Sequence, residues 1–272
     1  MKLTFGDSAL SLDRPVVMGV LNCTPDSFSD GGQFVDTALA VDHAQQMIAD
    51  GAAIIDIGGE STRPGAAAVP LAEELGRVIP VIEAIRQSSD IPLSVDTCKP
   101  EVMRAAIAAG ASMINDVTAL AADGAIDTVA ELRVPVCLMH MQGIPRTMQE
   151  APQYDDVVAE LVSFLQARAD ACVAGGIERD RIVIDPGFGF GKTLEHNLTL
   201  LKELPKFVAL GYPVLAGLSR KSMIGMILNR PVDERLAGSL ALALLAAQGG
   251  AHIIRVHDVR ETTDVLTILG AV

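Results

Sequence analysis

Short apolar runs recur along the chain, and polar residues follow each of them. Each run is short and bounded by polar residues, glycine or proline, which is typical of a strand buried on both faces of a parallel sheet. The runs cover residues 16–20, 53–57, 92–95, 112–114, 135–139, 181–184, 213–216 and 252–256.

Between these runs, apolar residues recur at roughly helical spacing, which predicts amphipathic helices. Glycine follows several of these segments, as at Gly51 and Gly110, and glycine is common just after a helix. A strand that follows a helix in this way indicates parallel strands joined by right-handed crossovers. The expected helices cover residues 36–50, 71–86, 101–109, 123–132, 155–175, 194–210, 233–249 and 259–269.

Eight strand–helix units predict an α/β fold of the (β/α)8 TIM-barrel type. Such a barrel typically takes about 250 residues, and the chain has 272, so residues 1–272 are expected to form a single domain. Residues 1–13 contain a turn at Gly6 and predict a short N-terminal β-hairpin that closes the bottom of the barrel.

Composition narrows the range of partners. A net charge of −13 argues against nucleic acid and anionic membranes as partners. The first residues lack the apolar core of a secretory signal, which predicts a cytoplasmic protein. The four cysteines form no C-x-x-C pair and are expected to be reduced, mostly buried thiols.

Polar residues cluster where the predicted strands end, which is the active face of such a barrel. Two of the loops there, residues 22–35 and 59–69, are long and rich in glycine, proline and hydroxyl groups. We expect them to be mobile active-site loops. The sequence of residues 187–193 is similar to a phosphate-binding P-loop, but Pro186 stands where that motif needs glycine.

Both loops resemble the motifs of the dihydropteroate synthases, the folate-pathway enzymes that sulfonamides target. The matching stretches are residues 22–32, 56–65, 96, 115–116, 185–192, 219–222 and 255–257. The resemblance implies a transferase that condenses 6-hydroxymethyl-7,8-dihydropterin pyrophosphate with p-aminobenzoate. The products would be 7,8-dihydropteroate and pyrophosphate, with Mg²⁺ assisting, and the enzyme would be a homodimer.

The pterin site can be assigned from the chemistry of its ring. The aminopyrimidine edge presents two N–H donors, which suit the Asp185 carboxylate, and the planar Arg255 guanidinium would stack on the ring. Lys221 would donate to the ring carbonyl and N5 region. The residues expected around the pterin are Val20, Asp96, Asn115, Met139, Asp185, Phe190, Lys221 and Arg255.

The pyrophosphate needs a local set of donors because the chain as a whole is acidic. We expect Asn22 to be a ligand of Mg²⁺, since Mg²⁺ prefers oxygen and takes much of its shell from substrate phosphates. The residues expected at the pyrophosphate are Asn22, Thr62, Arg63, Arg255 and His257.

The p-aminobenzoate site needs a donor for the carboxylate and apolar contacts for the ring. The residues expected there are Phe28, Arg63, Pro64, Phe190, Lys221 and Ser222. The residues expected to act in catalysis are Arg63, Asp96, Lys221 and His257. Because a dihydropterin can spread positive charge, we expect pyrophosphate to leave before the amine attacks.

Two alternatives compete with this interpretation. A methyltetrahydrofolate–corrinoid methyltransferase domain would share the strand-end Asp and Asn residues, but it would have no need of Arg63 in a mobile loop. A catalytically silent barrel would only bind a pterin or a partner. His140 follows the fifth strand as a lone histidine and is interpreted as structural. The last two predicted helices have apolar residues beyond one stripe, which would suit a dimer face.

Overall fold

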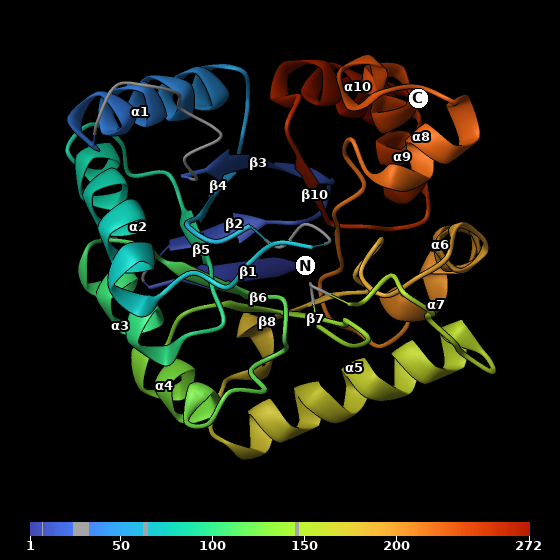
Figure 1. Cartoon of the computed structure of the whole chain (residues 1–272), viewed down its shortest axis with the longest axis horizontal. Coiled ribbons are helices and arrows are strands. Elements are labelled where there is room, and N and C mark those ends of the chain that lie inside the picture. Colours follow the sequence, from blue (N-terminus) through green and yellow to red (C-terminus); the bar gives the residue numbers. More distant parts are fainter. Residues whose placement is uncertain (7, 24–32, 62–64, 145–146) are drawn as a thin grey trace.

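The computed structural model describes residues 1–6, 8–23, 33–61, 65–144 and 147–272, with backbone alone for residues 33–36. Within these residues eight parallel strands form one sheet, and a parallel bridge between Ile184 and Val214 joins its two edges. The sheet is therefore a closed barrel, and helices surround it (Figure 1). In spatial order the strands are β8 (Ile182–Asp185), β7 (Val136–Met139), β6 (Met113–Asp116), β5 (Leu93–Asp96), β4 (Ile54–Gly58), β3 (Val16–Asn22), β10 (Ile253–Val256) and β9 (Leu215–Ala216).

The helices follow the predicted order, with three differences. The predicted helix 194–210 is wrong, because it breaks at Glu203: Pro205 lacks an N–H group and its ring would clash with the preceding turn. A short helix, α8, follows β9 and was not predicted, and α1 begins at Gln33, inside the predicted loop 22–35. The helices are α1 (Gln33–Ala49), α2 (Leu71–Arg86), α3 (Pro100–Ala108), α4 (Ala125–Leu132), α5 (Val157–Ala174), α6 (Leu194–Lys202), α7 (Leu204–Val208), α8 (Ser222–Leu228), α9 (Leu236–Gln248) and α10 (Val259–Ala271).

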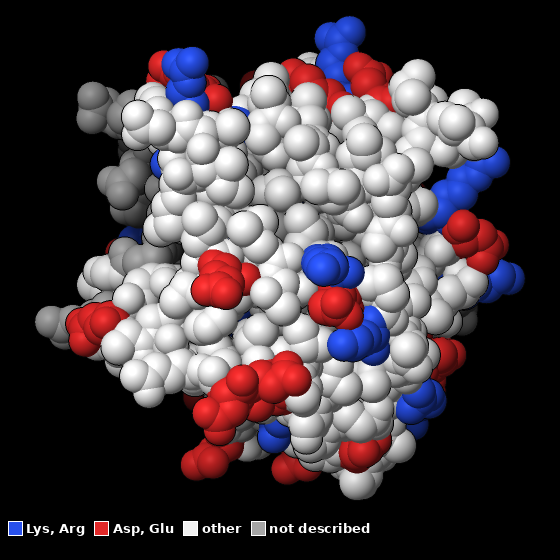
Figure 2. Space-filling view, turned by 90° about the vertical axis from the view of Figure 1, so that its right-hand side faces the viewer, with Lys and Arg blue, Asp and Glu red and all other residues white. Residues whose placement is uncertain are grey.

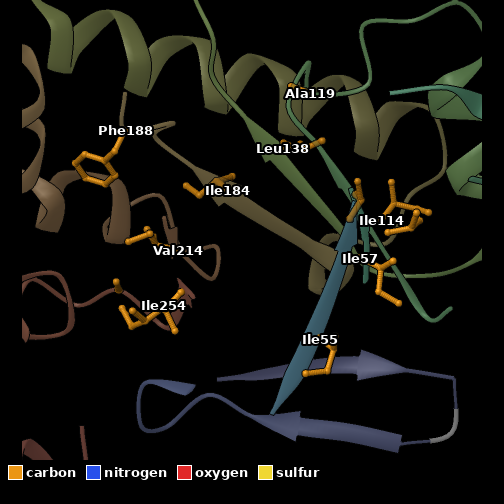
Figure 3. Packing of buried hydrophobic residues seen from close by; sticks show 14 of the residues in the cluster. Ile55, Ile57, Ile114, Ala119, Leu138, Ile184, Phe188, Val214 and Ile254 are labelled. Carbon is orange, nitrogen blue, oxygen red and sulfur yellow. The ribbon is translucent and has the colours of Figure 1, made fainter. Parts of the chain in front are cut away.

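The N-terminal hairpin closes one end of the barrel, as predicted. Strands β1 (Lys2–Phe5) and β2 (Ser8–Ser11) pair antiparallel, and the hairpin lies beside the start of β4 (Figure 3). Its residues Leu3 and Phe5 pack on apolar side chains from the first half of the barrel strands. We call these barrel side chains the lower layer: Met18, Ile54, Met113, Cys137, Val183, Leu215 and Ile253.

Alternate positions on the strands point out of the barrel, toward the helices. Ile55 and Ile57 of β4 are an example, since both are fully buried and both contribute to the packing shown in Figure 3. Burying a side chain of this size stabilises the fold by about 1.5–3 kcal/mol. The outer faces of the strands are therefore mostly apolar, with Asp116 at the end of β6 as an exception that bonds to Thr118 and Leu120. The polar side chains that can meet one another lie on the inner face.

None of the helices in the described ranges is long and apolar enough to cross a membrane. The four cysteines are free thiols, and three of them are buried, as predicted. Burial raises the pKa of Cys23 to about 12, so this thiol stays protonated.

Candidate active site

A second interior layer lies two residues further along the same strands. Because strand side chains alternate between faces, a residue two positions after a lower-layer residue points into the same interior. Asp56, for example, follows Ile54, and Arg255 follows Ile253. We call this set the upper layer, and it consists of Val20, Asp56, Asp96, Asn115, Met139, Asp185 and Arg255.

Arg255 connects two of these side chains, and a third joins through Asp56. Its Nε donates to Asp56 Oδ2 at 2.6 Å, and its Nη2 donates to Asp96 Oδ2 at 3.0 Å. Asn115 Nδ2 donates to the same Asp56 oxygen at 3.0 Å. The strand-end residues predicted from the sequence are therefore brought together, and the charge of Arg255 is directed at two carboxylates.

Asp56 is the residue of this network that the prediction missed. It lies at the start of the motif at residues 56–65, before the loop that contains the predicted residues Thr62, Arg63 and Pro64. Its side chain is fully buried, and its Oδ1 has no hydrogen-bond partner among the described residues. The signal for Asp56 is its position two residues after the lower-layer residue Ile54. The other upper-layer residues share this spacing except Asp96, which follows the buried Ser94.

Burial and charge act against each other at Asp96. Burial and the nearby Asp56 carboxylate raise the pKa of Asp96 to about 7, although the Arg255 charge lowers it. The two carboxylates in turn raise the pKa of Arg255, so the guanidinium stays charged. Asp96 therefore titrates close to neutral pH and is poised between proton acceptor and donor.

Asp185 and Lys221 face each other from β8 and the loop after β9. Asp185 Oδ1 accepts a hydrogen bond from the Gly187 N–H at 2.7 Å, and burial raises the pKa of Asp185. Lys221 Nζ donates to the carbonyl of Phe188 and lies 4.3 Å from the centre of the Phe190 ring. Burial lowers the pKa of Lys221 to about 8, and the Asp185 carboxylate opposes that effect.

His257 and Ser222 lie at the rim, beyond the strands. Strand β10 ends at Val256, so Arg255 lies on the strand and His257 is the first residue after it. Ser219 Oγ lies 3.1 Å from His257 Nδ1, and the His257 backbone N–H donates to the same oxygen at 3.2 Å. Ser222 is exposed and is the first residue of α8.

Asn22 ends β3 at the same rim and provides an oxygen suited to Mg²⁺. A β-carbon added to Gly58 would lie 3.9 Å from Asn22 Oδ1 and 4.0 Å from Asp96 Oδ2, so both oxygens flank one bare glycine. No group of three or more His, Cys, Asp or Glu residues that could hold a metal occurs in the described part of the chain. These residues fit an ion that takes most of its ligands from a diphosphate, not an ion held by protein alone.

The start of the loop after β4 is held firmly. Arg77 Nη1 of α2 donates to the Gly59 carbonyl at 2.6 Å, and Lys99 bridges Glu60 and the buried Glu74. Three predicted residues of this loop, Thr62, Arg63 and Pro64, lie outside the described residues. Phe28, predicted in the loop after β3, also lies outside them.

Two predicted apolar residues lie in the upper layer, and one lies beside it. Val20 and Met139 are 5% and 4% exposed, and both belong to the inner face. Phe190 is half-buried in the loop after β8. Together they add apolar surface to a site that also holds carboxylates, which suits a flat ring with a polar edge.

Comparison with known proteins agrees with this geometry. The family model described as "Pterin binding enzyme" matches residues 18–257. The dihydropteroate synthase of Escherichia coli K12 is 55% identical over 271 residues, covering 100% of this chain and 96% of that protein. A structure of Xanthomonas albilineans dihydropteroate synthase with 4-aminobenzoic acid is 57% identical, with a TM-score of 0.94, and the match covers 99% of this chain and 97% of that one. Another, in complex with 7,8-dihydropteroate, is 53% identical with a TM-score of 0.91, covering 100% and 98%.

Proposed function

The chain belongs to the pterin-binding enzyme family, as a dihydropteroate synthase, and from that premise we propose how its strand-end residues share the work. The reaction joins 6-hydroxymethyl-7,8-dihydropterin pyrophosphate to p-aminobenzoate in folate biosynthesis, and it releases pyrophosphate. The observation that carries the assignment is the upper layer, where Asp96, Asn115 and Asp185 converge inside the barrel.

The pterin is bound by the upper layer. Asp185 accepts two hydrogen bonds from the aminopyrimidine edge, and Asp96 and Asn115 contact other ring atoms. The one hydrogen bond that the Gly187 N–H gives Asp185 Oδ1 supports this role, because it orients the carboxylate into the barrel. Lys221 donates to the ring carbonyl and N5 region. Arg255 lies against the ring with its charge held in place by Asp56 and Asp96.

The pyrophosphate is bound at the rim of the barrel by Asn22, His257 and Arg255, with Thr62 and Arg63 from the second loop. The position of Asn22 Oδ1 beside Gly58, at the open end of β3, supports its role as a ligand of Mg²⁺. When bound, Mg²⁺ would neutralise charge on the leaving group. The remaining positive charge at the rim comes from Arg63 and Arg255.

The p-aminobenzoate ring packs against Phe190 and the aliphatic part of Lys221, and Phe28 and Pro64 complete the site. Lys221 Nζ lies 4.3 Å from the centre of the Phe190 ring, and this contact supports placing both residues in one site. Ser222, exposed and next to Lys221, offers its hydroxyl to the carboxylate.

In the mechanism we propose, pyrophosphate leaves before the amine attacks. The carboxylates of Asp96 and Asp185 stabilise the cationic pterin electrostatically, and the residues at the rim stabilise the departing pyrophosphate. The p-aminobenzoate amine is neutral at pH 7, so it attacks once it is held close to the pterin methylene carbon. No covalent enzyme intermediate forms.

We place the enzyme in the cytoplasm as a homodimer. Figure 2 shows a face with broad areas free of charged side chains, and it is the side of the molecule that carries α8 and α9. Exposed apolar residues gather on these elements, among them Met226 and Ile227 of α8 and Leu245 of α9. Apolar surface of this kind is typical of subunit interfaces. Light scattering should give twice the 28.5 kDa mass of the chain, and a monomer at micromolar concentration would refute the dimer.

Pyrophosphate release tests the function directly. The purified protein is given dihydropterin pyrophosphate and Mg²⁺, with and without p-aminobenzoate. We expect steady-state release, as distinct from a first turnover, to depend on p-aminobenzoate. It should fall at least about hundredfold in Asp185→Asn, since one oriented acceptor is lost from the site. Release that ignores p-aminobenzoate, or no release, would contradict the assignment.

A further inference from the structure

Two neighbouring loops at the top of the barrel are packed tightly against each other. One follows β7 and begins with His140, and the other is the glycine-rich loop that follows β8, residues 186–193. A β-carbon on Gly187 would overlap the carbonyl oxygen of His140, so the loops approach more closely than any other residue allows. Tyr154 Oη also donates to the carbonyl of Gly191 at 2.8 Å.

Lys192 lies between these loops and is only 3% exposed. Its Nζ lies 2.9 Å from the Phe190 carbonyl, 3.3 Å from the His140 carbonyl and 3.1 Å from His140 Nδ1. Three acceptors match the three donors of the ammonium form of Lys192. Burial lowers the pKa of Lys192 to about 7, and the Asp185 carboxylate opposes that effect. The sequence around Lys192 is similar to a P-loop, yet its ammonium faces loop carbonyls and is closed off from solvent.

His140 is suited to be an acceptor for this lysine. Burial lowers the pKa of His140 to about 3, and the Lys192 charge lowers it further, so the ring is neutral. The edge of the ring packs against Phe164, with 4.8 Å between the two ring centres. A neutral ring fixed in this way can accept at Nδ1, provided that its proton is on Nε2.

The other side of the glycine-rich loop faces the active site. The carbonyl of Phe188 accepts from Lys221 Nζ, and the Phe190 ring lies against the same ammonium group. A β-carbon on Gly189 would lie 3.0 Å from Lys221 Cδ. The shape of this loop therefore decides where Phe190 and Lys221 lie.

We propose that Lys192, held by His140, is a positioning residue that fixes Phe190 and Lys221 for p-aminobenzoate. This role rests on the proposed function of Phe190 and Lys221. Lys192 touches neither substrate, and acts by tying the loop after β8 to the loop after β7. It also gives a role to His140, the strand-end residue that the sequence left as structural.

The test compares Lys192→Met with the matched control Lys202→Met, an exposed lysine on α6. Kinetics with each substrate are combined with hydrogen exchange of the peptide that spans residues 186–193. For Lys192→Met we expect the KM for p-aminobenzoate to rise about tenfold and kcat to fall, since small displacements of positioned groups are costly. The KM for the pterin substrate should rise less than the KM for p-aminobenzoate. Lys221 contacts the pterin as well, but Asp96 and Asn115 lie on other strands and keep their contacts.

The histidine provides a second, independent test. His140→Asn keeps an acceptor near the position of Nδ1, whereas His140→Leu removes it. The Asn variant should retain slow exchange of residues 186–193 and a near-normal KM for p-aminobenzoate, and the Leu variant should lose both. This pair of variants tests the proposed role of the Lys192–His140 contact even when Lys192→Met fails to fold.

The proposal is overturned when folded Lys192→Met shows normal loop exchange and a normal KM for p-aminobenzoate. Equal losses with both substrates, following a lowered melting temperature, would overturn it too, because they indicate a structural role alone. A wild-type protein that releases no pyrophosphate would contradict the proposed function instead, and loop exchange would still test the tie between the loops.

Discussion

The lower layer and the charged part of the upper layer both line the barrel interior, yet they differ in chemistry. The lower layer is apolar and packs on the hairpin, as Met113 does. The upper layer holds Asp56, Asp96, Asp185 and Arg255, all buried or half-buried. The lower layer stabilises the fold by burying apolar side chains. The charged groups of the upper layer lose solvation when they are buried, which destabilises the fold, but they are placed to bind a ligand. A change in either layer should therefore affect a different property.

Removal of Arg255 should have the largest effect. Arg255→Met leaves the carboxylates of Asp56 and Asp96 buried without their cation, which costs stability by about 3–5 kcal/mol. Activity should fall at least about hundredfold, because an oriented charge is lost from the site. Urea unfolding and pyrophosphate release measure the two effects. Arg260→Met, on the exposed part of α10, is the control and should change neither.

A cavity in the lower layer should separate stability from activity. Met113→Ala removes a fully buried side chain from the layer that packs on the hairpin, at a cost of about 2–5 kcal/mol. Activity of the folded protein should stay within about twofold of wild type, since the upper layer keeps its contacts. A hundredfold loss of kcat in folded Met113→Ala would mean that the two layers are not independent.

Much of this contrast can be predicted from the sequence. The alternation of apolar residues gives the barrel, and the polar residues at strand ends give Asp96, Asn115 and Asp185. Asp56 is harder to find, because an aspartate inside an apolar run has no obvious partner until Arg255, 199 residues away, is seen beside it. The helix break before Pro205 is expected, because proline disfavours a helix interior. Pro80, however, lies inside α2 without breaking it, so a proline alone does not predict where a helix ends.

Contacts between loops are the part that sequence does not provide. Lys192 and His140 are 52 positions apart, and only the packing of β7 beside β8 brings their loops together. The order of strands predicts that these loops are neighbours. It does not predict which side chain reaches across, because that depends on the backbone turns at Gly187 and Gly191.

Two glycines with positive φ lie at opposite ends of the barrel and have different surroundings. Gly6 (φ 56°) lies in the hairpin with nothing near a β-carbon, whereas Gly187 (φ 67°) lies against His140. Gly6→Ala should lower the free energy of unfolding by about 1–2 kcal/mol, which is the penalty for a residue with a β-carbon in the left-handed conformation. Gly187→Ala should cost more and should also raise the KM for p-aminobenzoate. Equal melting temperatures for the two variants would contradict the close approach of the loops.

A pH profile should give the smallest effect, a factor of a few across the neutral range. Asp96, with a pKa of about 7, must be ionised to accept from the pterin, so kcat/KM should fall as pH drops below 7. Lys221, with a pKa of about 8, must keep its proton to donate, so kcat/KM should also fall as pH rises above 8. In Lys221→Arg the alkaline decline should disappear. An unchanged alkaline decline in that variant would assign it to another group.

Stability should also depend on pH through Asp96. Its pKa is raised in the folded protein, so the folded state holds a proton that the unfolded state releases between about pH 4 and 7. The contribution of Asp96 to stability is therefore lost as pH rises through about 7. When the pH is raised from 5 to 8, the free energy of unfolding, measured by urea unfolding, should fall less for Asp96→Asn than for wild type. Exposed Asp123→Asn should follow wild type.

The most direct test of the central claim is a crystal structure of this chain with 7,8-dihydropteroate. The account predicts that the pterin lies in the upper layer, with its aminopyrimidine edge in hydrogen-bond contact with Asp185 and with Asp96 and Asn115 at other ring atoms. A pterin bound outside the barrel interior, or one that leaves Asp185 without a contact, would contradict it.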